Sequence, residues 1–196
     1  MAAVKPKEIG RSPRVAYTIR TLKVLTEPIQ DLQDLSAIDE YFAQADSWVV
    51  YAPGDKFGHY ATLLGNLTGY APSVQAPTFH FLRSFVKEGL PRCAFERVKS
   101  ALGISADQLS LTTEISARTV SRRQRFRPDE SERLLRVASA FQKALELFED
   151  IEKARKWFTT PKSALDGMTP LECCDTEEGS NEVENLIGRI DEGVYS

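Results

Sequence analysis

The densest cluster of chemically active side chains is a run of arginines in the second half of the sequence. The stretch from 115 to 127 holds no aspartate or glutamate and five arginines: Arg118, Arg122, Arg123, Arg125 and Arg127. A guanidinium bonds bidentately to the edge of a guanine and also pairs with phosphate. The cluster therefore indicates contact with nucleic acid, although an arginine-rich helix is often only a solvated surface.

The surrounding sequence predicts the helices that would carry these arginines. Ser105 and Gln108 form a capping box at the start of one short helix, and Ser116 caps a second helix about three residues beyond the first. Two short helices joined in this way, with apolar residues facing inward, are typical of a helix-turn-helix. The inward positions are Leu109, Ile115 and Val120. The predicted DNA-binding set is Ser116, Arg118, Thr119, Arg122, Arg123 and Arg125.

Three further features frame this motif. Glu114 occupies a turn position where a small residue is usual, so we expect its carboxylate to lie near phosphate and to weaken DNA binding. A helix over 93–102 precedes the motif and stops at Gly103. After the motif, Pro128 breaks the chain and Asp129 opens a long helix whose apolar residues step by three or four.

Composition bounds the classes of protein to which the chain can belong. Its 196 residues, 42% of them hydrophobic, suffice for one domain or two small ones, and no apolar run approaches the ~20 residues of a membrane helix. The three cysteines lack metal-binding spacing and fit free thiols in a reducing cytosol. We therefore expect a cytoplasmic protein with no metal, no cofactor and no membrane contact.

The net charge of −3 conceals a segregation of charge along the chain. Residues 1–25 hold six basic and one acidic side chain, whereas residues 161–196 hold nine acidic and two basic. A chain with a basic region and an acidic end offers different surfaces to different partners. Between these regions, residues 31–46 predict an acidic amphipathic helix, and SWVVY is a short apolar segment before a Pro-Gly turn.

Beyond the long helix the sequence carries a second distinctive string. The pattern W-F-x-T-P-x-x-A-L-x-G-x-T-P-L runs from Trp157 to Leu171, and Gly179, Arg189-Ile190 and Gly193 follow it. Together with GISADQLSLTTEISARTVSRRQRFRPDESERLLRVASAF, this string resembles the Xre/MbcA/ParS antitoxins. The resemblance covers about residues 90–196.

The resemblance implies a mainly α fold. An Xre-type helix-turn-helix bundle would occupy 76–148 and a small α-helical toxin-binding domain 149–196, with 1–75 as an N-terminal extension of uncertain structure. The resemblance does not reach residues 1–75, and we expect this extension to serve packing or dimerisation and to be dispensable for protection against the toxin. In the C-terminal domain, we expect Pro161 and Pro170 to stop helices, and Thr176 or Ser180 to cap the last one.

Partners in this family are RES-domain toxins, which resemble ADP-ribosyltransferases and degrade NAD. The resemblance implies an antitoxin that blocks the NAD pocket of such a toxin and represses its own operon as a homodimer bound to promoter DNA. A pocket that binds pyrophosphate is expected to be basic, so an acidic tail tipped by an aromatic residue suits it. The predicted toxin-binding set is Trp157, Pro161, Leu165, Leu171, Arg189, Glu192, Val194, Tyr195 and Ser196.

Three alternatives stay open. Trp157 and Leu171 could instead seal the C-terminal helices onto the long helix. The chain could be a stand-alone Xre-type transcriptional regulator whose C-terminal domain only dimerises. It could also be an enzyme with Cys173 or Cys174 as nucleophile, but both histidines lie far away in the sequence, so we expect no catalytic residues.

Overall fold

Helices dominate the structure, a computed structural model. It describes residues 21–25, 47–51, 62–63, 65–68, 83 and 86–194, the first two ranges by their backbone alone. Within these residues the strands are β1 (Thr21–Leu25) and β2 (Ser47–Tyr51), which pair in parallel with Thr21 opposite Ser47. The predicted apolar segment SWVVY is therefore β2, whereas the helix predicted over 31–46 lies outside the described residues. The mainly α fold is confirmed.

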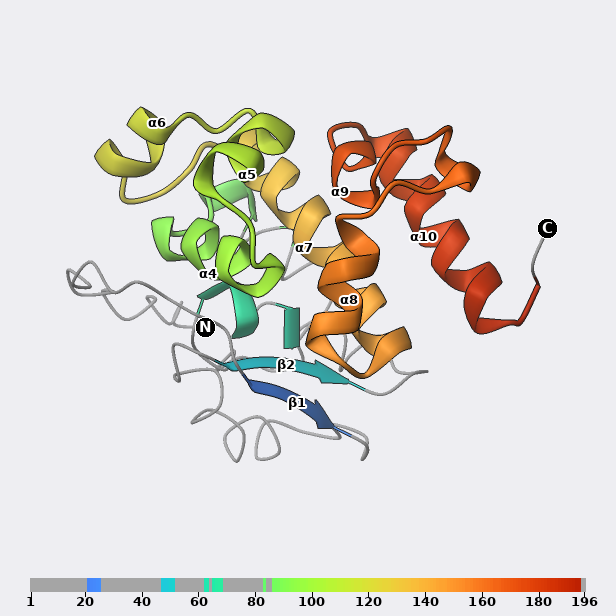
Figure 1. Cartoon of the computed structure of the whole chain (residues 1–196). Coiled ribbons are helices and arrows are strands. Elements are labelled where there is room, and N and C mark those ends of the chain that lie inside the picture. Colours follow the sequence, from blue (N-terminus) through green and yellow to red (C-terminus); the bar gives the residue numbers. More distant parts are fainter. Residues whose placement is uncertain are drawn as a thin grey trace.

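The helices after residue 90 follow the predicted order, and Figure 1 shows their arrangement. Their bounds are α4 Arg92–Leu102, α5 Ala106–Thr113, α6 Ala117–Arg122, α7 Pro128–Phe148, α8 Ile151–Phe158, the 3₁₀ helix η1 Ser163–Leu165, α9 Pro170–Cys173 and α10 Glu177–Asp191. The long helix α7 runs through the middle of the molecule, with α4 to α6 on one side and α8 to α10 on the other.

The predicted caps on both sides of the turn are confirmed. Gly103 ends α4 in the left-handed conformation (φ 67°), and the Ser105 and Gln108 side chains form the reciprocal capping box of α5. The Ser116 hydroxyl accepts from the Thr119 N–H at 3.2 Å and caps α6. Short-range sequence patterns predicted these features because the residues that satisfy each helix end lie within three positions of it.

The prolines act differently from the prediction. Pro128 and Pro170 do not only stop helices, because each occupies the first turn of the next one, α7 and α9. Proline is favoured there because its fixed φ suits the helix and the N–H that it lacks would have no partner. Of the two caps proposed for the last helix, Thr176 is the N-cap, and Ser180 is buried inside α10.

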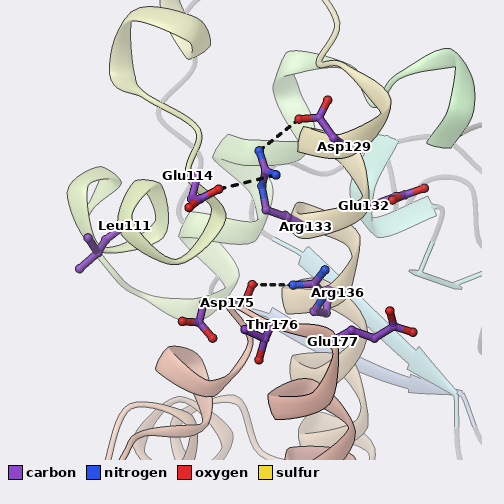
Figure 2. Close-up of a pocket in the computed structure, with 9 residues that line it drawn as sticks. All are labelled: Leu111, Glu114, Asp129, Glu132, Arg133, Arg136, Asp175, Thr176 and Glu177. Carbon is purple, nitrogen blue, oxygen red and sulfur yellow. Dashed lines mark hydrogen bonds and ion pairs between the residues drawn. The ribbon is translucent and has the colours of Figure 1, made fainter.

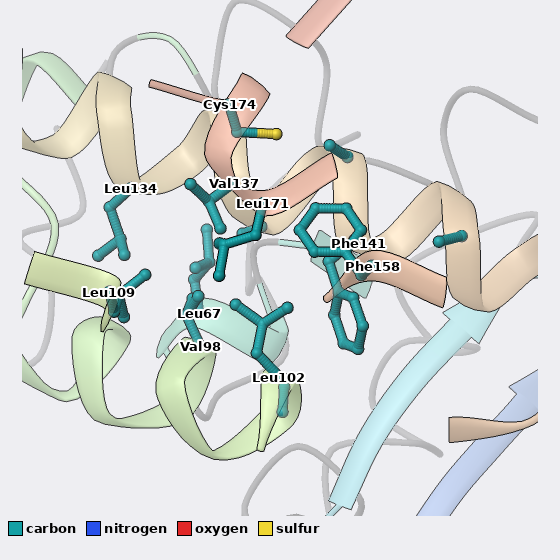
Figure 3. Packing of buried hydrophobic residues seen from close by; sticks show 14 of the residues in the cluster. Leu67, Val98, Leu102, Leu109, Leu134, Val137, Phe141, Phe158, Leu171 and Cys174 are labelled. Carbon is teal, nitrogen blue, oxygen red and sulfur yellow. The ribbon is translucent and has the colours of Figure 1, made fainter. Parts of the chain in front are cut away.

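One continuous hydrophobic core joins the predicted helix-turn-helix bundle (76–148) to the predicted toxin-binding domain (149–196). Leu134 and Val137 of α7 belong to the same buried cluster as Leu109 of α5. Phe141 of α7 meets Phe158 of α8 edge to face at 5.4 Å between ring centroids. Figure 3 shows this packing around α7. The boundary predicted at residue 148 thus marks a division in the sequence that packing crosses, because α7 supplies core residues to both sides.

The predicted extension also contributes to this core. The described helical residues 62–63 and 65–68 include Leu63 and Leu67, which are 1% and 0% exposed. Arg97 of α4 is 1% exposed and donates to the Asn66 carbonyl oxygen, and Gln142 of α7 contacts Thr62 and Asn66. Residues 62–63 and 65–68 therefore belong to the packed interior of the helix-turn-helix unit, which gives this part of 1–75 a structural role.

Candidate nucleic-acid interface and C-terminal face

The helix-turn-helix geometry brings three of the predicted DNA-binding residues, Arg118, Thr119 and Arg122, together on α6, and Ser116 is the N-cap of this helix. Helix α6 lies at one end of the molecule (Figure 1). Leu109 and Ile115 are fully buried and Val120 is half-buried, so they fix α5, the turn and α6 against the core as predicted. Arg118 and Arg122 are exposed and stand four residues apart, which places them on the same face of α6. Neither forms an ion pair with any described residue.

The other two members of the predicted set lie in the loop after α6, and their side chains engage the protein. Arg123 Nη1 lies 3.0 and 2.8 Å from the two carboxylate oxygens of Glu130. Arg125 Nη1 donates to the Gly89 carbonyl oxygen at 2.7 Å, and the Arg125 backbone bridges to Pro91. A guanidinium held in this way is less available to DNA than one that projects into solvent.

Glu114 adopts the left-handed conformation (φ 53°) at the C-terminus of α5, where glycine is the usual residue. Its carboxylate lies 3.7 Å from Arg133 Nη1 of α7, and Arg133 Nε donates to the Thr113 carbonyl oxygen at 2.7 Å. Figure 2 shows Arg133 between Glu114 and Asp129. The Glu114 side chain is 75% exposed and pairs with α7, and its closeness to phosphate stays a prediction.

Arg133 belongs to the wall of a hollow between the helix-turn-helix and the C-terminal helices (Figure 2). The hollow has a volume of about 500 Å³, and its lining residues are Leu111, Glu114, Asp129, Glu132, Arg133, Arg136, Asp175, Thr176 and Glu177. Across it, Arg136 Nη1 donates to the carbonyl oxygens of Asp175 and Cys174 at 2.7 and 3.3 Å. These bonds link α7 directly to the segment between α9 and α10.

Trp157 and Lys162 lie together and partly exposed on the surface of the C-terminal helices, and this surface is here called the Trp157 face. The Trp157 ring is half-buried against Phe148 (5.8 Å between centroids), and Lys162 Nζ lies 5.3 Å from the centre of the indole. Burial lowers the pKa of Lys162. A cation over an indole face is favourable. Leu165 and Leu171 differ from Trp157, because they are only 5% and 6% exposed and lie in the core.

The remaining predicted toxin-binding residues lie at the surface or outside the described part. Pro161 and Glu192 are exposed, Arg189 is half-buried, and Val194 is 52% exposed. Tyr195 and Ser196 lie outside the described residues. The predicted toxin-binding set therefore combines exposed residues with core residues, since a sequence motif does not distinguish the two.

The chain leaves α10 through a defined turn. Gly193 is left-handed (φ 70°), its N–H donates to the Ile190 carbonyl at 3.1 Å, and the Val194 N–H donates to the Arg189 carbonyl at 2.9 Å. These two bonds are those of a Schellman motif, which turns the chain sharply away from the helix axis. The direction of the chain end is thus set by a glycine conformation.

The cysteine chemistry considered from the sequence finds little support in the geometry. Cys174 is fully buried and burial raises its thiol pKa to about 12, and burial also raises the pKa of Cys173. A thiol that stays protonated at neutral pH is a weak nucleophile. The described residues include no group of histidine, cysteine, aspartate or glutamate arranged for a metal ion, and no helix in the described part is long and apolar enough to cross a membrane.

Several structural contacts were not predicted from the sequence. Glu130, Arg133 and Arg136 of α7 hold the loop after α6, the end of α5 and the end of α9, and Arg155 of α8 donates to the Ala101 and Ser100 carbonyl oxygens at the end of α4. The only available signal was the presence of charged residues between the apolar positions of α7. Such residues are ordinarily solvated, so the signal was weak.

Comparison with known proteins matches both parts of the chain. The family described as antitoxin Xre-like helix-turn-helix domain matches residues 82–139, and that described as antitoxin Xre/MbcA/ParS C-terminal toxin-binding domain matches residues 143–193. A protein named Antitoxin Xre from Photorhabdus laumondii subsp. laumondii is 33% identical over 130 residues, which cover 64% of this chain and 86% of that protein.

Two more relatives carry the same name. Antitoxin Xre of Yersinia enterocolitica is 34% identical over 116 residues, covering 57% of this chain and 78% of that protein. Antitoxin Xre of Pseudomonas putida is 32% identical over 90 residues, covering 46% of this chain and 56% of that protein.

Proposed function

The chain belongs to the Xre/MbcA/ParS family of antitoxins, and from this membership we propose that it neutralises a RES-domain toxin by blocking the NAD pocket of that toxin. Membership establishes an antitoxin with a DNA-binding helix-turn-helix and a C-terminal toxin-binding domain. The proposal adds the class of toxin and the mode of inhibition. It also includes repression of the antitoxin's own operon, as a homodimer bound to promoter DNA, and no catalysis by the antitoxin itself.

The observation that carries the blocking mode is the end of α10. Asp191, Glu192 and Val194 are exposed there, and the Schellman turn at Gly193 directs the chain away from the helix. A pocket that binds the pyrophosphate of NAD requires positive potential, so an acidic segment ending in apolar side chains complements it in charge and shape. The half-buried Trp157 face provides a second contact area in the proposal.

The separation of the two surfaces supports simultaneous binding of DNA and toxin. The arginine-bearing helix α6 and the end of α10 lie at opposite ends of the molecule (Figure 1). A toxin seated on the end of α10 would therefore leave Arg118 and Arg122 accessible. This arrangement allows the toxin–antitoxin complex, as well as the antitoxin alone, to bind promoter DNA.

The test is purification of the chain together with a RES-domain protein encoded beside it, followed by measurement of NAD turnover. We expect a stable complex in which NAD consumption is suppressed, and restored consumption when residues 194–196 are deleted. Full suppression by the truncated chain would assign the block to the Trp157 face. A stand-alone regulator would form no complex with such a toxin and would still bind promoter DNA.

A further inference from the structure

The helix α6, which is proposed to read DNA, is weakly anchored by its own side chains. The helix α6 has six residues, and none of its side chains is fully buried. A helix of this length is unstable in isolation, since nucleation costs more than a few hydrogen bonds return. Its position relative to the rest of the molecule therefore depends on what holds the segments immediately before and after it.

Buried Ile115 and Phe126 anchor these two segments in the core, and one face of α7 adds polar contacts to both of them. Before α6, Arg133 Nε donates to the Thr113 carbonyl oxygen at 2.7 Å, and its guanidinium lies 3.7 Å from the Glu114 carboxylate. After α6, Glu130 receives Arg123 Nη1 on both oxygens and accepts from the Arg127 backbone N–H at 2.7 Å. Glu130 and Arg133 are three residues apart and so lie on the same face of the helix.

Partial burial of Glu130 and Arg133 shelters the pair with Arg123 and the bond to the Thr113 carbonyl oxygen, whereas the Glu114 side chain is 75% exposed. The side chains of Glu130 and Arg133 are 11% and 23% exposed, and each makes bonds to backbone as well as to a charged side chain. Charge-assisted hydrogen bonds sheltered from water are stronger and better defined in geometry than neutral ones. Glu130 and Arg133 can therefore fix the segments on both sides of α6.

We propose that Glu130 and Arg133, here called the α7 clamp, are positioning residues that set the orientation of α6 for specific DNA recognition. The proposal rests on the proposed function of α6 as the DNA-reading helix. Base readout requires the arginines to be held within about 0.5 Å of the productive geometry, which a loosely tethered helix does not achieve. In this assignment Arg118 and Arg122 contact DNA, whereas Arg123 acts through Glu130 rather than on DNA.

The substitution Glu130→Gln separates positioning from electrostatics because the two effects have opposite signs. Glutamine keeps the shape of the side chain and its capping capacity at this helix position, but it removes the negative charge that holds Arg123. On electrostatic grounds alone, losing one negative charge beside a DNA-binding surface tightens binding. The α7 clamp predicts the reverse for specific DNA, with a promoter affinity lower by roughly tenfold or more.

Glu132→Gln is the matched control. Glu132 lies on the same helix two positions away, is exposed, and makes no ion pair with any described residue, so its substitution changes charge without touching the clamp. Binding of labelled promoter DNA and of random duplex should be measured as a function of salt. For Glu130→Gln we expect weaker promoter binding with an unchanged salt dependence, whereas each lost phosphate contact reduces the logarithmic slope by about 0.9.

Arg133→Lys provides the second variant, because it keeps the charge but cannot bond at once to the Thr113 carbonyl and to two carboxylates. It should also lose promoter affinity while its thermal midpoint and its binding to toxin stay close to those of the unmodified chain. Promoter binding by either folded variant that equals or exceeds the unmodified chain would overturn the clamp. Failure of the unmodified chain to bind its promoter would overturn both the clamp and the DNA-binding proposal.

Discussion

The side-chain amide of Gln142 on α7 donates to the Thr62 hydroxyl at 2.8 Å, and both side chains are fully buried although 80 positions separate them. The Asn66 side chain donates to the same glutamine at 3.3 Å. A polar contact of this kind in a core is specific, because each group left without a partner costs about 1–3 kcal/mol. It ties a segment of the predicted extension to the central helix of the fold.

Replacing Gln142 with Ala should therefore lower the free energy of unfolding by about 2–4 kcal/mol, since it creates a cavity and removes one hydrogen bond from each of two buried side chains. Gln124→Ala is the control, because Gln124 is exposed and should change stability by less than about 0.5 kcal/mol. Urea unfolding followed by circular dichroism measures both. Equal stability of the two variants would contradict the structural role of Thr62 and Asn66.

A chain that begins at residue 76 should fail to fold stably. The deletion removes Leu63 and Leu67 from the core and leaves Arg97 without the Asn66 carbonyl. Two buried leucines are worth about 2–5 kcal/mol each, which approaches the roughly 5–15 kcal/mol stability of a whole domain. The measurement is the unfolding transition of the truncated chain beside the full one. A cooperative transition at the same urea concentration would restore the extension to the dispensable role that the sequence suggested.

Substitution of both Arg118 and Arg122 with Ala should abolish specific promoter binding and leave toxin binding intact. These exposed arginines share one face of α6, and loss of a base-contacting arginine costs about 1–3 kcal/mol. Lys153 and Lys156 of α8, both exposed, supply the matched control when both are replaced with Ala, because the net charge changes equally. A normal footprint of the arginine variant on the promoter would show that another surface reads DNA.

Features that depend on interactions between residues close in sequence could be predicted from the sequence, whereas features that depend on long-range contacts could not. Ser105, Gln108 and Ser116 were assigned correctly because a helix cap is satisfied by residues three positions away. Glu130 and Arg133 were not, because their partners at Arg123 and Thr113 are brought to α7 only by folding. The inward-facing residues of α7 could be predicted from their spacing. Every residue has a backbone carbonyl oxygen, so the sequence does not indicate which of them the arginines of α7 contact.

The same limit explains the mixed composition of the predicted toxin-binding set. Trp157 and Leu171 stand in one motif, but the indole is half-buried at the surface and Leu171 is 6% exposed. A sequence motif contains residues that shape a surface as well as residues that contact a partner. Exposure separates these two roles only when the tertiary structure is known.

Leu171→Ala should consequently act on stability. Truncation of a buried leucine costs about 2–5 kcal/mol through lost burial and the cavity that remains. Met168 lies in the same region and is 47% exposed, so Met168→Ala should cost less than about 0.5 kcal/mol. Thermal unfolding compares the two. If Leu171→Ala were as stable as Met168→Ala and yet lost toxin binding, Leu171 would be a contact residue instead.

The last prediction concerns the turn that releases the chain from α10. Gly193 has a φ of 70°, and a Cβ at this position would meet no atom within 4 Å, so backbone conformation alone requires the glycine. Gly193→Ala should therefore cost only about 1 kcal/mol in stability but redirect the residues beyond it, and it should weaken inhibition of NAD consumption by the toxin. Gly193→Asn should retain more inhibition, because asparagine tolerates the left-handed conformation.

Gly188→Ala is the control for this experiment. A Cβ there also meets no atom within 4 Å, and Gly188 lies within α10, where alanine is favoured. It should fold at least as stably as the unmodified chain and inhibit the toxin equally well. The turnover of NAD by purified complexes of toxin with each variant tests whether the direction of the chain after Gly193 affects inhibition. Equal inhibition by Gly193→Ala, Gly193→Asn and Gly188→Ala would mean that the direction of the chain end is irrelevant, and that the face around Trp157 blocks the toxin.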